Sequence, residues 1–208
     1  LTGSAKAFCA GADLMSGRGS RAGVGAGTVR LEHAHRVIAA LRQFRGPVIA
    51  AVEGACVGVG WSIALACDLV IAGSSAYFLA PFVQRGLVPD SGLSWLLQQS
   101  LGPVQAAEIV MFGERMPAEQ ARELGLVNRV VPAGEVEAFA AEWALRLAGE
   151  STSGDALELS KRLVEAGRSV GLGDFLRIEW SFAALGLQGP DAAEGVASFR
   201  ERRPSRFA

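Results

Sequence analysis

The feature that most constrains the fold is a pair of short apolar runs that flank a glycine-rich loop and a helical segment. The runs span residues 48–52 and 69–72, and each is continuous in apolar residues, which is typical of strands buried on both faces. Between them, the sequence predicts a loop over 54–60 and a short buried helix over 61–67. A strand, a helix and a second strand of these lengths form a compact βαβ unit, so we expect a parallel sheet.

Helical periodicity dominates the rest of the chain. Apolar residues recur at helical spacing over 29–44, which predicts an amphipathic helix that ends at Gly46-Pro47. The stretch 17–27, rich in glycine and arginine, is expected to be a mobile surface loop. Further helices are expected at 91–101, 103–112, 117–124, 135–148, 155–167, 173–187 and 191–201, with one more strand at 127–131. The chain therefore divides into an α/β core over 1–132 and an all-helical region over 133–208.

Composition excludes several classes of partner. The 208 residues carry a net charge of −1, so there is no basic excess to bind nucleic acid or a membrane surface. The apolar runs are too short, and too often interrupted by glycine, to span a bilayer. The three cysteines, Cys9, Cys56 and Cys67, are widely spaced without a Cys-x-x-Cys pair, which argues against disulfides and a zinc site. We expect reduced thiols in a cytoplasmic enzyme without a metal.

Two loops of small residues could bring backbone N–H groups close to a ligand. The first spans 8–13 and ends at Asp13, which could cap a following helical turn, although a plain tight turn explains this segment equally well. The second spans 53–60 and leads into the helix predicted at 61–67. Glycine-rich loops at helix N-termini bind anions. The second loop lacks the Gly-Lys-Ser/Thr of a phosphate-binding loop and the third glycine of a dinucleotide fingerprint, so a small oxyanion is the best guest.

A serine hydrolase is a competing interpretation of the second loop. The sequence Gly60-Trp61-Ser62-Ile63-Ala64 nearly matches the nucleophile elbow Gly-x-Ser-x-Gly. Such hydrolases take their base from a histidine that follows the serine. The two histidines of this chain, His33 and His35, both precede Ser62 on a polar helical stretch and are expected to form a solvated helix face. The pattern therefore argues against a Ser–His–Asp hydrolase.

The third segment of interest, 81–92, carries a lone carboxylate. Asp90 follows an apolar stretch and precedes the predicted helix at 91–101. Apolar surroundings disfavour the ionised form of a carboxyl group, which suits it to exchange protons at neutral pH. The alternative is that Asp90 serves only as the N-cap of that helix, because aspartate is a favoured N-cap residue.

Together, these segments resemble the crotonase (enoyl-CoA hydratase/isomerase) superfamily. The resemblance covers the whole chain and rests on LTGSAKAFCAGADL, GPVIAAVEGACVGVGWSIALACDLVIA, APFVQRGLVPDSGLSWLL, GERMPAEQARELGLVNRVV and DAAEGVASFRERRPSRF. It implies a crotonase-like α/β spiral of ββα units, an all-helical C-terminal region that builds trimers or dimers of trimers, and an N-terminal portion preceding Leu1. It also implies an oxyanion hole made of the backbone N–H groups of Ala12 and Val59.

The resemblance also bears on the reaction. Hydratases of this family use two glutamates, and the matching positions here hold Ser62 and Phe82, which argues against ordinary hydration. The segment Gly86-Leu87-Val88-Pro89-Asp90 is similar to that of the enoyl-CoA isomerases, in which an acidic residue at this place shuttles the proton. We therefore expect a double-bond shift from 3-enoyl-CoA to 2-enoyl-CoA with Asp90 as the acid–base. Two alternatives stay open: a hydratase, lyase or thioesterase in which Asp90 activates water, and a non-catalytic acyl-CoA binder.

Substrate contacts follow from the same resemblance. The expected partner is an acyl-CoA thioester, and coenzyme A is part of that substrate, so no separate cofactor is expected. Ala10 and Asp13 would line the adenine side, and Ser62 would lie in the acyl site. Candidate walls for the acyl chain, each equally well explained as core, are Met15, Phe82, Leu87 and Trp95. Near the C-terminus, Arg202, Arg203 and Phe207 could contact the nucleotide, although a solvated basic tail explains them as well.

Overall fold

The computed structural model describes residues 1–4, 6–13 and 24–207, which form two compact units. The first unit comprises 1–44 and 48–140, and the second comprises 45–47 and 141–208. Most of the loop predicted at 17–27, together with Met15, lies outside the described residues, but the part from Val24 onward is helical, so the predicted end of that loop was wrong. None of the helices in the described part of the chain is long and apolar enough to cross a membrane.

The first unit contains two small sheets that are largely parallel. Its strands are β1 (Ala7–Cys9), β2 (Ile49–Val52), β3 (Ala55–Val57), β4 (Leu69–Gly73), β5 (Tyr77–Leu79), β6 (Met116–Pro117) and β7 (Arg129–Val131). One sheet has the order β1-β3-β5-β6, in which only β6 is antiparallel to its neighbour, and the other has the parallel order β2-β4-β7. The predicted parallel pairing is confirmed, because Ile49 to Val52 pair in register with Leu69 to Ala72.

The prediction of a plain loop over 54–60 was wrong, because strand β3 lies within it. Three residues are too few to show the alternation that marks a strand, and the same brevity hid β1, β5 and β6. The loop predicted over 8–13 therefore begins only after Cys9. The helix predicted at 61–67 also begins earlier, at Val59. The chain thus enters the helix directly from β3 through a single residue, Gly58.

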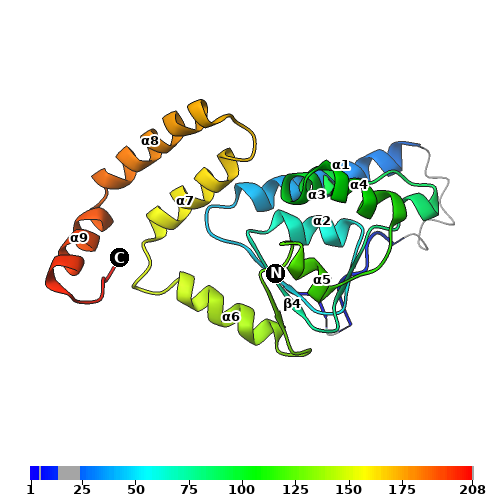
Figure 1. Cartoon of the computed structure of the whole chain (residues 1–208), viewed down its shortest axis with the longest axis horizontal. Helices are drawn as coiled ribbons and strands as arrows, with labels where there is room; N and C mark the ends of the chain where they lie inside the picture. The colour runs from blue at the N-terminus through cyan, green and yellow to red at the C-terminus, as the bar shows by residue number, and fades with distance from the viewer. Residues whose placement is uncertain (5, 14–23, 208) are drawn as a thin grey trace. The chain divides into compact units, whose positions relative to one another are not determined.

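The helices of the first unit are α1 (Val24–Gln43), α2 (Val59–Ala66), α3 (Leu93–Leu101), α4 (Pro103–Phe112), α5 (Ala118–Glu123) and the start of α6 (Val136–Leu147). Helix α2 is apolar almost all round, as expected of a helix enclosed by other elements, and it packs against both α1 and α3 (Figure 1). In the core, the ring of Trp61 on α2 lies 5.5 Å from the ring of Phe78 on β5. His33 and His35 are exposed on α1, as predicted.

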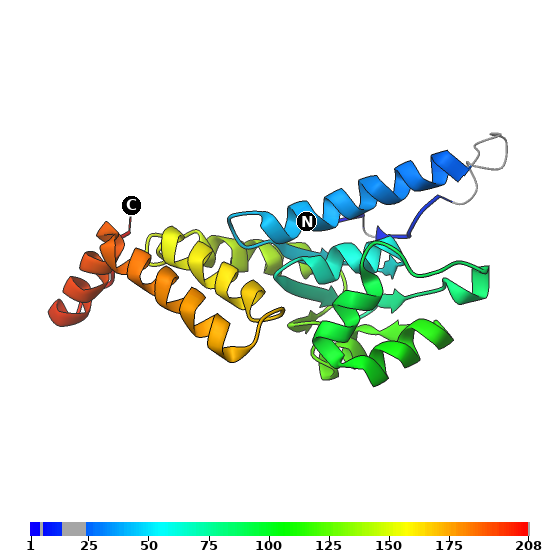
Figure 2. The same cartoon turned by 90° about the horizontal axis from the view of Figure 1, so that it is seen from above.

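The second unit is helical, which confirms the prediction for the C-terminal region. It contains the rest of α6, then α7 (Gly154–Ala166), α8 (Leu172–Gln188) and α9 (Pro190–Glu201). Helix α7 is capped by Ser153, whose Oγ accepts a hydrogen bond from the Ala156 N–H, and α7 packs along α8 (Figure 2). Large apolar side chains on these helices are exposed in the single chain, among them Trp180 and Phe199.

Candidate active site

The three segments singled out in the sequence all follow neighbouring parallel strands. Strand β3 lies between β1 and β5 in the same sheet, with Cys56 beside Cys9 and Val57 beside Leu79. The loop with Ala12 follows β1, helix α2 follows β3, and the segment with Asp90 follows β5. The carboxyl ends of neighbouring parallel strands meet at one edge of a sheet, which is where α/β proteins bind ligands. The topology therefore brings the start of all three segments to one edge.

The first two segments touch backbone to backbone. Gly11 has a φ of +93°, and a Cβ built on it would lie 3.2 Å from the carbonyl oxygen of Val57. Gly60, in the first turn of α2, lies still closer: its Cβ would be 2.6 Å from both the Cβ and the carbonyl oxygen of Cys9. Only glycine allows this approach, so the two glycines bring the loop after β1 against the N-terminus of α2.

The start of α2 presents backbone N–H groups that the helix itself cannot satisfy. Gly58 is its N-cap, with a φ of +57°, and donates its own N–H to the carbonyl oxygen of Leu79 at 2.9 Å. Val59 is the first residue of the helix, so its N–H has no carbonyl one turn earlier to bond to. An orphan donor at the positive end of a helix dipole suits a small anion.

The loop after β1 is exposed to solvent around Ala12, one of the two residues predicted to form the oxyanion hole. Ala10, Ala12 and Asp13 are all exposed, and Gly11 between them is half-buried against Val57. Ala12 is thus accessible to solvent beside Gly11, the residue through which the loop contacts Val57. Asp13 is the last residue described before the gap at 14–23.

Asp90 is not the N-cap of α3, so the alternative role considered for it is wrong. The N-cap is Gly92, at φ +74°, and no side chain caps this helix. Asp90 contributes only its backbone carbonyl, which accepts from the Leu93 N–H at 3.1 Å. Its half-buried carboxylate accepts a hydrogen bond at Oδ1 from the hydroxyl of Ser91, at 2.9 Å. The carboxylate therefore keeps acceptor capacity for a ligand.

The segment between β5 and α3 is folded around the carbonyl of Phe82. This oxygen accepts from the N–H groups of Arg85 and Leu87, both at 2.9 Å, and closes the short 3-10 helix η1 (Val83–Arg85). The Phe82 ring is buried, and its tip lies 3.7 Å from the position of a Cβ on Gly58. Phe82 thus forms an apolar wall beside the start of α2.

The remaining predicted contacts differ in burial. Ser62, one helical turn beyond Val59, is fully buried, and its Oγ has no hydrogen-bond partner among the described residues. Leu87 and Trp95 are 46% and 45% exposed in the single chain, so neither belongs to the core of the unit. Ser62 and Phe82 therefore lie next to the start of α2 within the fold, whereas Leu87 and Trp95 lie at its surface.

The C-terminal tail is held by ion pairs. Arg203 contacts Glu194 through both terminal nitrogens, at 2.6 and 2.9 Å, and reaches Glu201 at 2.6 Å. These carboxylates raise the pKa of Arg203, with the Glu194 hydrogen bond the largest cause. The Arg203 charge is thus compensated within the second unit, whereas Arg202 is exposed and ends α9 in the left-handed conformation, with a φ of +54°.

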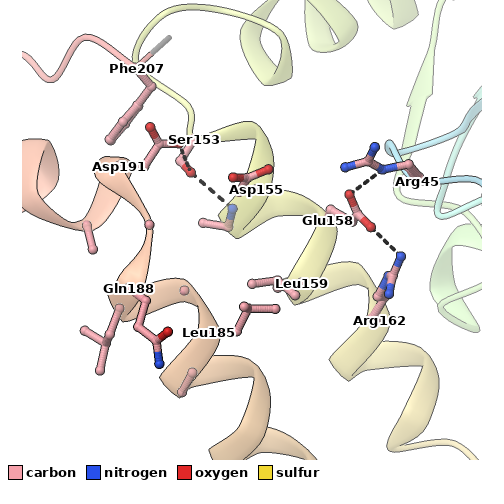
Figure 3. A pocket seen from close by; sticks show the side chains of 16 residues that line it. Arg45, Ser153, Asp155, Glu158, Leu159, Arg162, Leu185, Gln188, Asp191 and Phe207 are labelled. Carbon is pink, nitrogen blue, oxygen red and sulfur yellow. Dashed lines mark hydrogen bonds and ion pairs between the residues drawn. The ribbon is translucent and has the colours of Figure 1, made fainter.

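A pocket of about 780 Å³ lies within the second unit between α7, α8 and the tail. Figure 3 shows Glu158 between Arg45 and Arg162, at 2.7 and 2.5 Å, and Phe207 on the opposite side. The hydrogen bond from Arg45 is the largest cause that lowers the pKa of Glu158. Except for Phe207, none of the residues singled out in the sequence lines this pocket, so its size does not mark it as the place of the chemistry.

Sequence reasoning missed two contributors to the site. Ser91 is buried, has a φ of +54° and holds the Asp90 carboxylate. The Asp-Ser-Gly sequence indicates a turn, but the donated hydrogen bond depends on a backbone conformation that the sequence alone does not reveal. Cys9 was considered only for its thiol group, whereas its Cβ and carbonyl oxygen pack against Gly60.

Known proteins resemble this chain in both sequence and fold. A family model described as enoyl-CoA hydratase/isomerase matches residues 1–208. A probable enoyl-CoA hydratase of Rhodobacter capsulatus is 38% identical over 211 residues, and the 1,2-epoxyphenylacetyl-CoA isomerase of Escherichia coli is 33% identical over 211 residues. Each alignment covers 100% of this chain and 79% of the relative. A crystal structure of an enoyl-CoA hydratase from Polaromonas sp. JS666 has a TM-score of 0.93 at 36% identity, over 100% of this chain and 80% of that one.

Proposed function

The chain belongs to the enoyl-CoA hydratase/isomerase family, and we propose that it shifts a double bond in an acyl-CoA thioester, from 3-enoyl-CoA to 2-enoyl-CoA. Relatives named as a hydratase and as an isomerase both align over the whole chain, so the reaction has to be argued from the residues themselves. The observation that carries the proposal is the half-buried carboxylate of Asp90, which does not cap α3 and accepts a hydrogen bond from Ser91.

In the proposed mechanism, one carboxylate serves both proton transfers. The Asp90 carboxylate removes a proton from C2 of the 3-enoyl-CoA, and the electron pair of that C–H bond moves into the thioester, giving a dienolate with its negative charge on oxygen. The protonated Asp90 then delivers the same proton to C4. The double bond moves to C2–C3, and the carboxylate is restored. Proton transfer by a positioned side chain typically accelerates a reaction by about 10²–10⁴-fold.

The backbone N–H groups of Ala12 and Val59 would stabilise the dienolate oxygen. Support comes from the contact of Gly11 with Val57 and from the position of Val59 at the first residue of α2. Backbone donors fixed in advance need no reorganisation as charge develops on the oxygen. A single such donor typically contributes about 10²–10³-fold in rate.

The residues around the start of α2 favour isomerisation over hydration. Hydration requires a group that activates water, and the two positions at which the family resemblance expects glutamates hold Ser62 and Phe82. Ser62 is buried and has no hydrogen-bonded base among the residues that the structure describes, and Phe82 is a buried apolar wall. An apolar wall keeps water away from the dienolate, which would otherwise be open to side reactions.

The test compares two substrates and two variants. We expect the wild-type protein to convert a 3-enoyl-CoA to the 2-enoyl-CoA, and Asp90→Asn to lower kcat by about 10²–10⁴-fold, because the amide cannot accept the proton. Asp174→Asn is the matched control, because Asp174 is an exposed carboxylate on α8 that forms a surface ion pair with Arg177. Its kcat should equal that of the wild type.

Hydration is the second candidate, favoured by the hydratase name of the relative with 38% identity. In that case Asp90 would activate water for addition to a 2-enoyl-CoA. If the protein hydrates 2-enoyl-CoA in a reaction that depends on Asp90, and does not convert 3-enoyl-CoA, then it is a hydratase and the isomerase proposal is wrong. Binding of acyl-CoA without turnover of either substrate would instead indicate a non-catalytic binder.

A further inference from the structure

Two of the three cysteines lie side by side against the first turn of α2. Cys9 on β1 is the paired neighbour of Cys56 on β3, which is in turn the paired neighbour of Phe78 on β5. Paired residues on neighbouring strands project from the same face of a sheet. At one end of this row Cys9 packs against Gly60 of α2, and at the other the ring of Phe78 lies 5.5 Å from that of Trp61. The buried Cys56 between them therefore faces α2 as well, on the same side as Cys9.

The spacing of this pair suits a disulfide. Neighbouring strands lie about 4.8 Å apart, and disulfides join residues whose Cα atoms are about 4.4–6.8 Å apart. The third thiol, Cys67, lies at the other end of α2 and donates to the Ile63 carbonyl at 3.3 Å. Within the part of the chain that the structure describes, no group of His, Cys, Asp and Glu side chains could hold a metal ion. The chemistry to consider is that of the two thiols themselves.

The two thiols differ in what can reach them. Cys9 is half-buried and is followed by the exposed Ala10, so a small oxidant has access to its sulfur. Cys56 is fully buried, and its burial, followed by the nearby thiols of Cys9 and Cys67, raises its pKa well above the usual range. The thiolate is the form that reacts with oxidants, so a protonated and enclosed thiol is inert toward them. Oxidation is therefore expected to begin at Cys9 and to pass from there to Cys56.

We propose that Cys9 and Cys56 form a reversible oxidation site, at which a hydroperoxide converts the two thiols into a disulfide that disturbs the predicted oxyanion hole. The Cys9 sulfur attacks one peroxide oxygen, the O–O bond breaks, and the other oxygen leaves with the thiol proton, as water when the oxidant is hydrogen peroxide. The Cys56 sulfur then attacks the resulting sulfenic acid, the S–O bond breaks, and the hydroxyl group leaves with the Cys56 proton as water. Two electrons pass from the two thiols to the peroxide. Two equivalents of a thiol reductant reverse the change by exchange and become a disulfide themselves.

The position of Cys9 connects this bond to the candidate active site. Cys9 ends β1 and directly precedes the loop that contains Ala12. Its sulfur lies 3.0 Å from the position of a Cβ on Gly60, the residue after Val59. To bond to Cys56, this sulfur has to move from Gly60 toward β3, which alters the contact between the loop and α2. A displacement of about 1 Å in an active site can cost about 10²-fold in rate. The bond itself does not depend on the reaction, but its effect on kcat rests on the proposed function.

The test follows the thiols and the rate in the same samples. The full chain is treated with hydrogen peroxide, which catalase then removes, and the remaining thiols are alkylated in denaturant. We expect one alkylated thiol in place of three, and a peptide map that joins Cys9 to Cys56. In the treated protein, kcat for 3-enoyl-CoA should fall by at least about tenfold, and dithiothreitol should restore it.

Two variants separate the disulfide from other effects of peroxide. Cys67→Ala is the matched control, because Cys67 is also buried but lies outside the row that contains Cys9 and Cys56. It should form the same disulfide and lose the same share of its kcat. Cys56→Ala should form no disulfide, and dimedone, which traps sulfenic acids, should label its Cys9. Peroxide should lower the kcat of Cys56→Ala less than that of the wild type.

Several results would overturn the inference. In the wild type these are three free thiols after treatment, a disulfide that includes Cys67, or a sulfinic acid at Cys9 in place of the disulfide. A disulfide between Cys9 and Cys56 that leaves kcat unchanged, or an equal loss of kcat in Cys56→Ala, would also contradict it. If the untreated protein converts no acyl-CoA, the proposed function fails together with the expected effect on kcat, and the peptide map still decides whether the pair is an oxidation site.

Discussion

Among single residues, Ser91 is the one whose conformation is most closely tied to the chemistry proposed for Asp90. It is buried and has a φ of +54°, a region that costs a non-glycine residue about 1–2 kcal/mol. A glycine would avoid this cost, but it would lack the hydroxyl that donates to the Asp90 carboxylate at 2.9 Å. Strain kept at a site together with a functional contact is a common feature of active sites.

Ser91 is therefore expected to act as a positioning residue. In Ser91→Ala, we expect kcat for 3-enoyl-CoA to fall about 10–100-fold, because a hydrogen bond to a charged group is worth about 1.5–3 kcal/mol. The loss should appear in kcat rather than in KM, because the hydroxyl orients the carboxylate that moves the proton. Ser91→Thr, which keeps the hydroxyl, should recover part of the rate. An unchanged kcat in Ser91→Ala would mean that Ser91 serves the turn and not the carboxylate.

Glu194 gives a pH dependence to the C-terminal tail. Its pKa is lowered from 4.5 to about 2, first by the hydrogen bonds from Arg203 and then by the backbone N–H of Arg206. A carboxyl group with a lowered pKa in the folded state stabilises that state above its unfolded pKa, and this contribution is lost as pH falls from about 4.5 toward 2. The tail should therefore loosen in acid.

Thermal melts of the wild type and Glu194→Gln test this expectation. The two proteins should differ most near neutral pH, and the difference in Tm should shrink as pH is lowered to about 3. Glu179→Gln, at an exposed position on α8, is the control and should follow the wild type at every pH. A constant difference between wild type and Glu194→Gln across this range would contradict the assignment.

At the scale of elements, the sequence predicted the long helices and missed the short strands. Helices α3, α4 and α6 to α9 lie within two or three residues of their predicted bounds, because each repeats its apolar pattern over several turns. Strands β1, β3, β5 and β6 have two or three residues and no such repeat. Three of them nevertheless position the site, because β1, β3 and β5 are neighbours in one sheet and bring together the segments that follow them.

The segments that form the candidate site could be predicted from the sequence, but the contacts between their residues could not. A glycine-rich loop before a helix predicts an anion-binding site, and an aspartate after an apolar stretch predicts a carboxylate in the same region. The orphan hydroxyl of Ser62 and the close approach of Gly60 to Cys9 depend on tertiary packing, which no local pattern encodes.

Gly60→Ala tests the contact between the loop after β1 and the start of α2. A methyl group at residue 60 would overlap Cys9, so we expect the free energy of unfolding to fall by about 1–3 kcal/mol. We also expect a lower kcat, because the two predicted oxyanion donors would move apart. The control is Gly173→Ala in α8, where a Cβ meets no atom within 4 Å. Denaturant unfolding should show the control to be as stable as the wild type or slightly more stable. Equal stability of Gly60→Ala and the control would contradict the packing described.

At the scale of the whole molecule, the second unit exposes a larger area of apolar side chains than a stable monomer is expected to expose. Trp180 is 74% exposed, Leu187 77% and Phe199 84%, all on or beside the C-terminal helices. Large exposed apolar surfaces mark sites of association. We expect these helices to pack against other copies of the chain in a homotrimer or a dimer of trimers.

Light scattering coupled to size exclusion tests this expectation. The wild type should have the mass of three or six chains, and Trp180→Lys should shift it toward the monomer, because a charge would be buried at the interface. Arg177→Gln is a control on the same helix, at an exposed position that forms an ion pair with Asp174. A wild-type monomer at micromolar concentration would contradict the prediction.

The most direct test of the proposed mechanism is a crystal structure of the protein with a bound, unreactive 3-enoyl-CoA analogue. The thioester oxygen should lie about 2.7–3.1 Å from the backbone nitrogens of both Ala12 and Val59. A carboxylate oxygen of Asp90 should lie about 3–3.5 Å from C2 and face C4 on the same side of the chain. A thioester oxygen bonded elsewhere, or a carboxylate of Asp90 turned away into bulk water, would contradict the account.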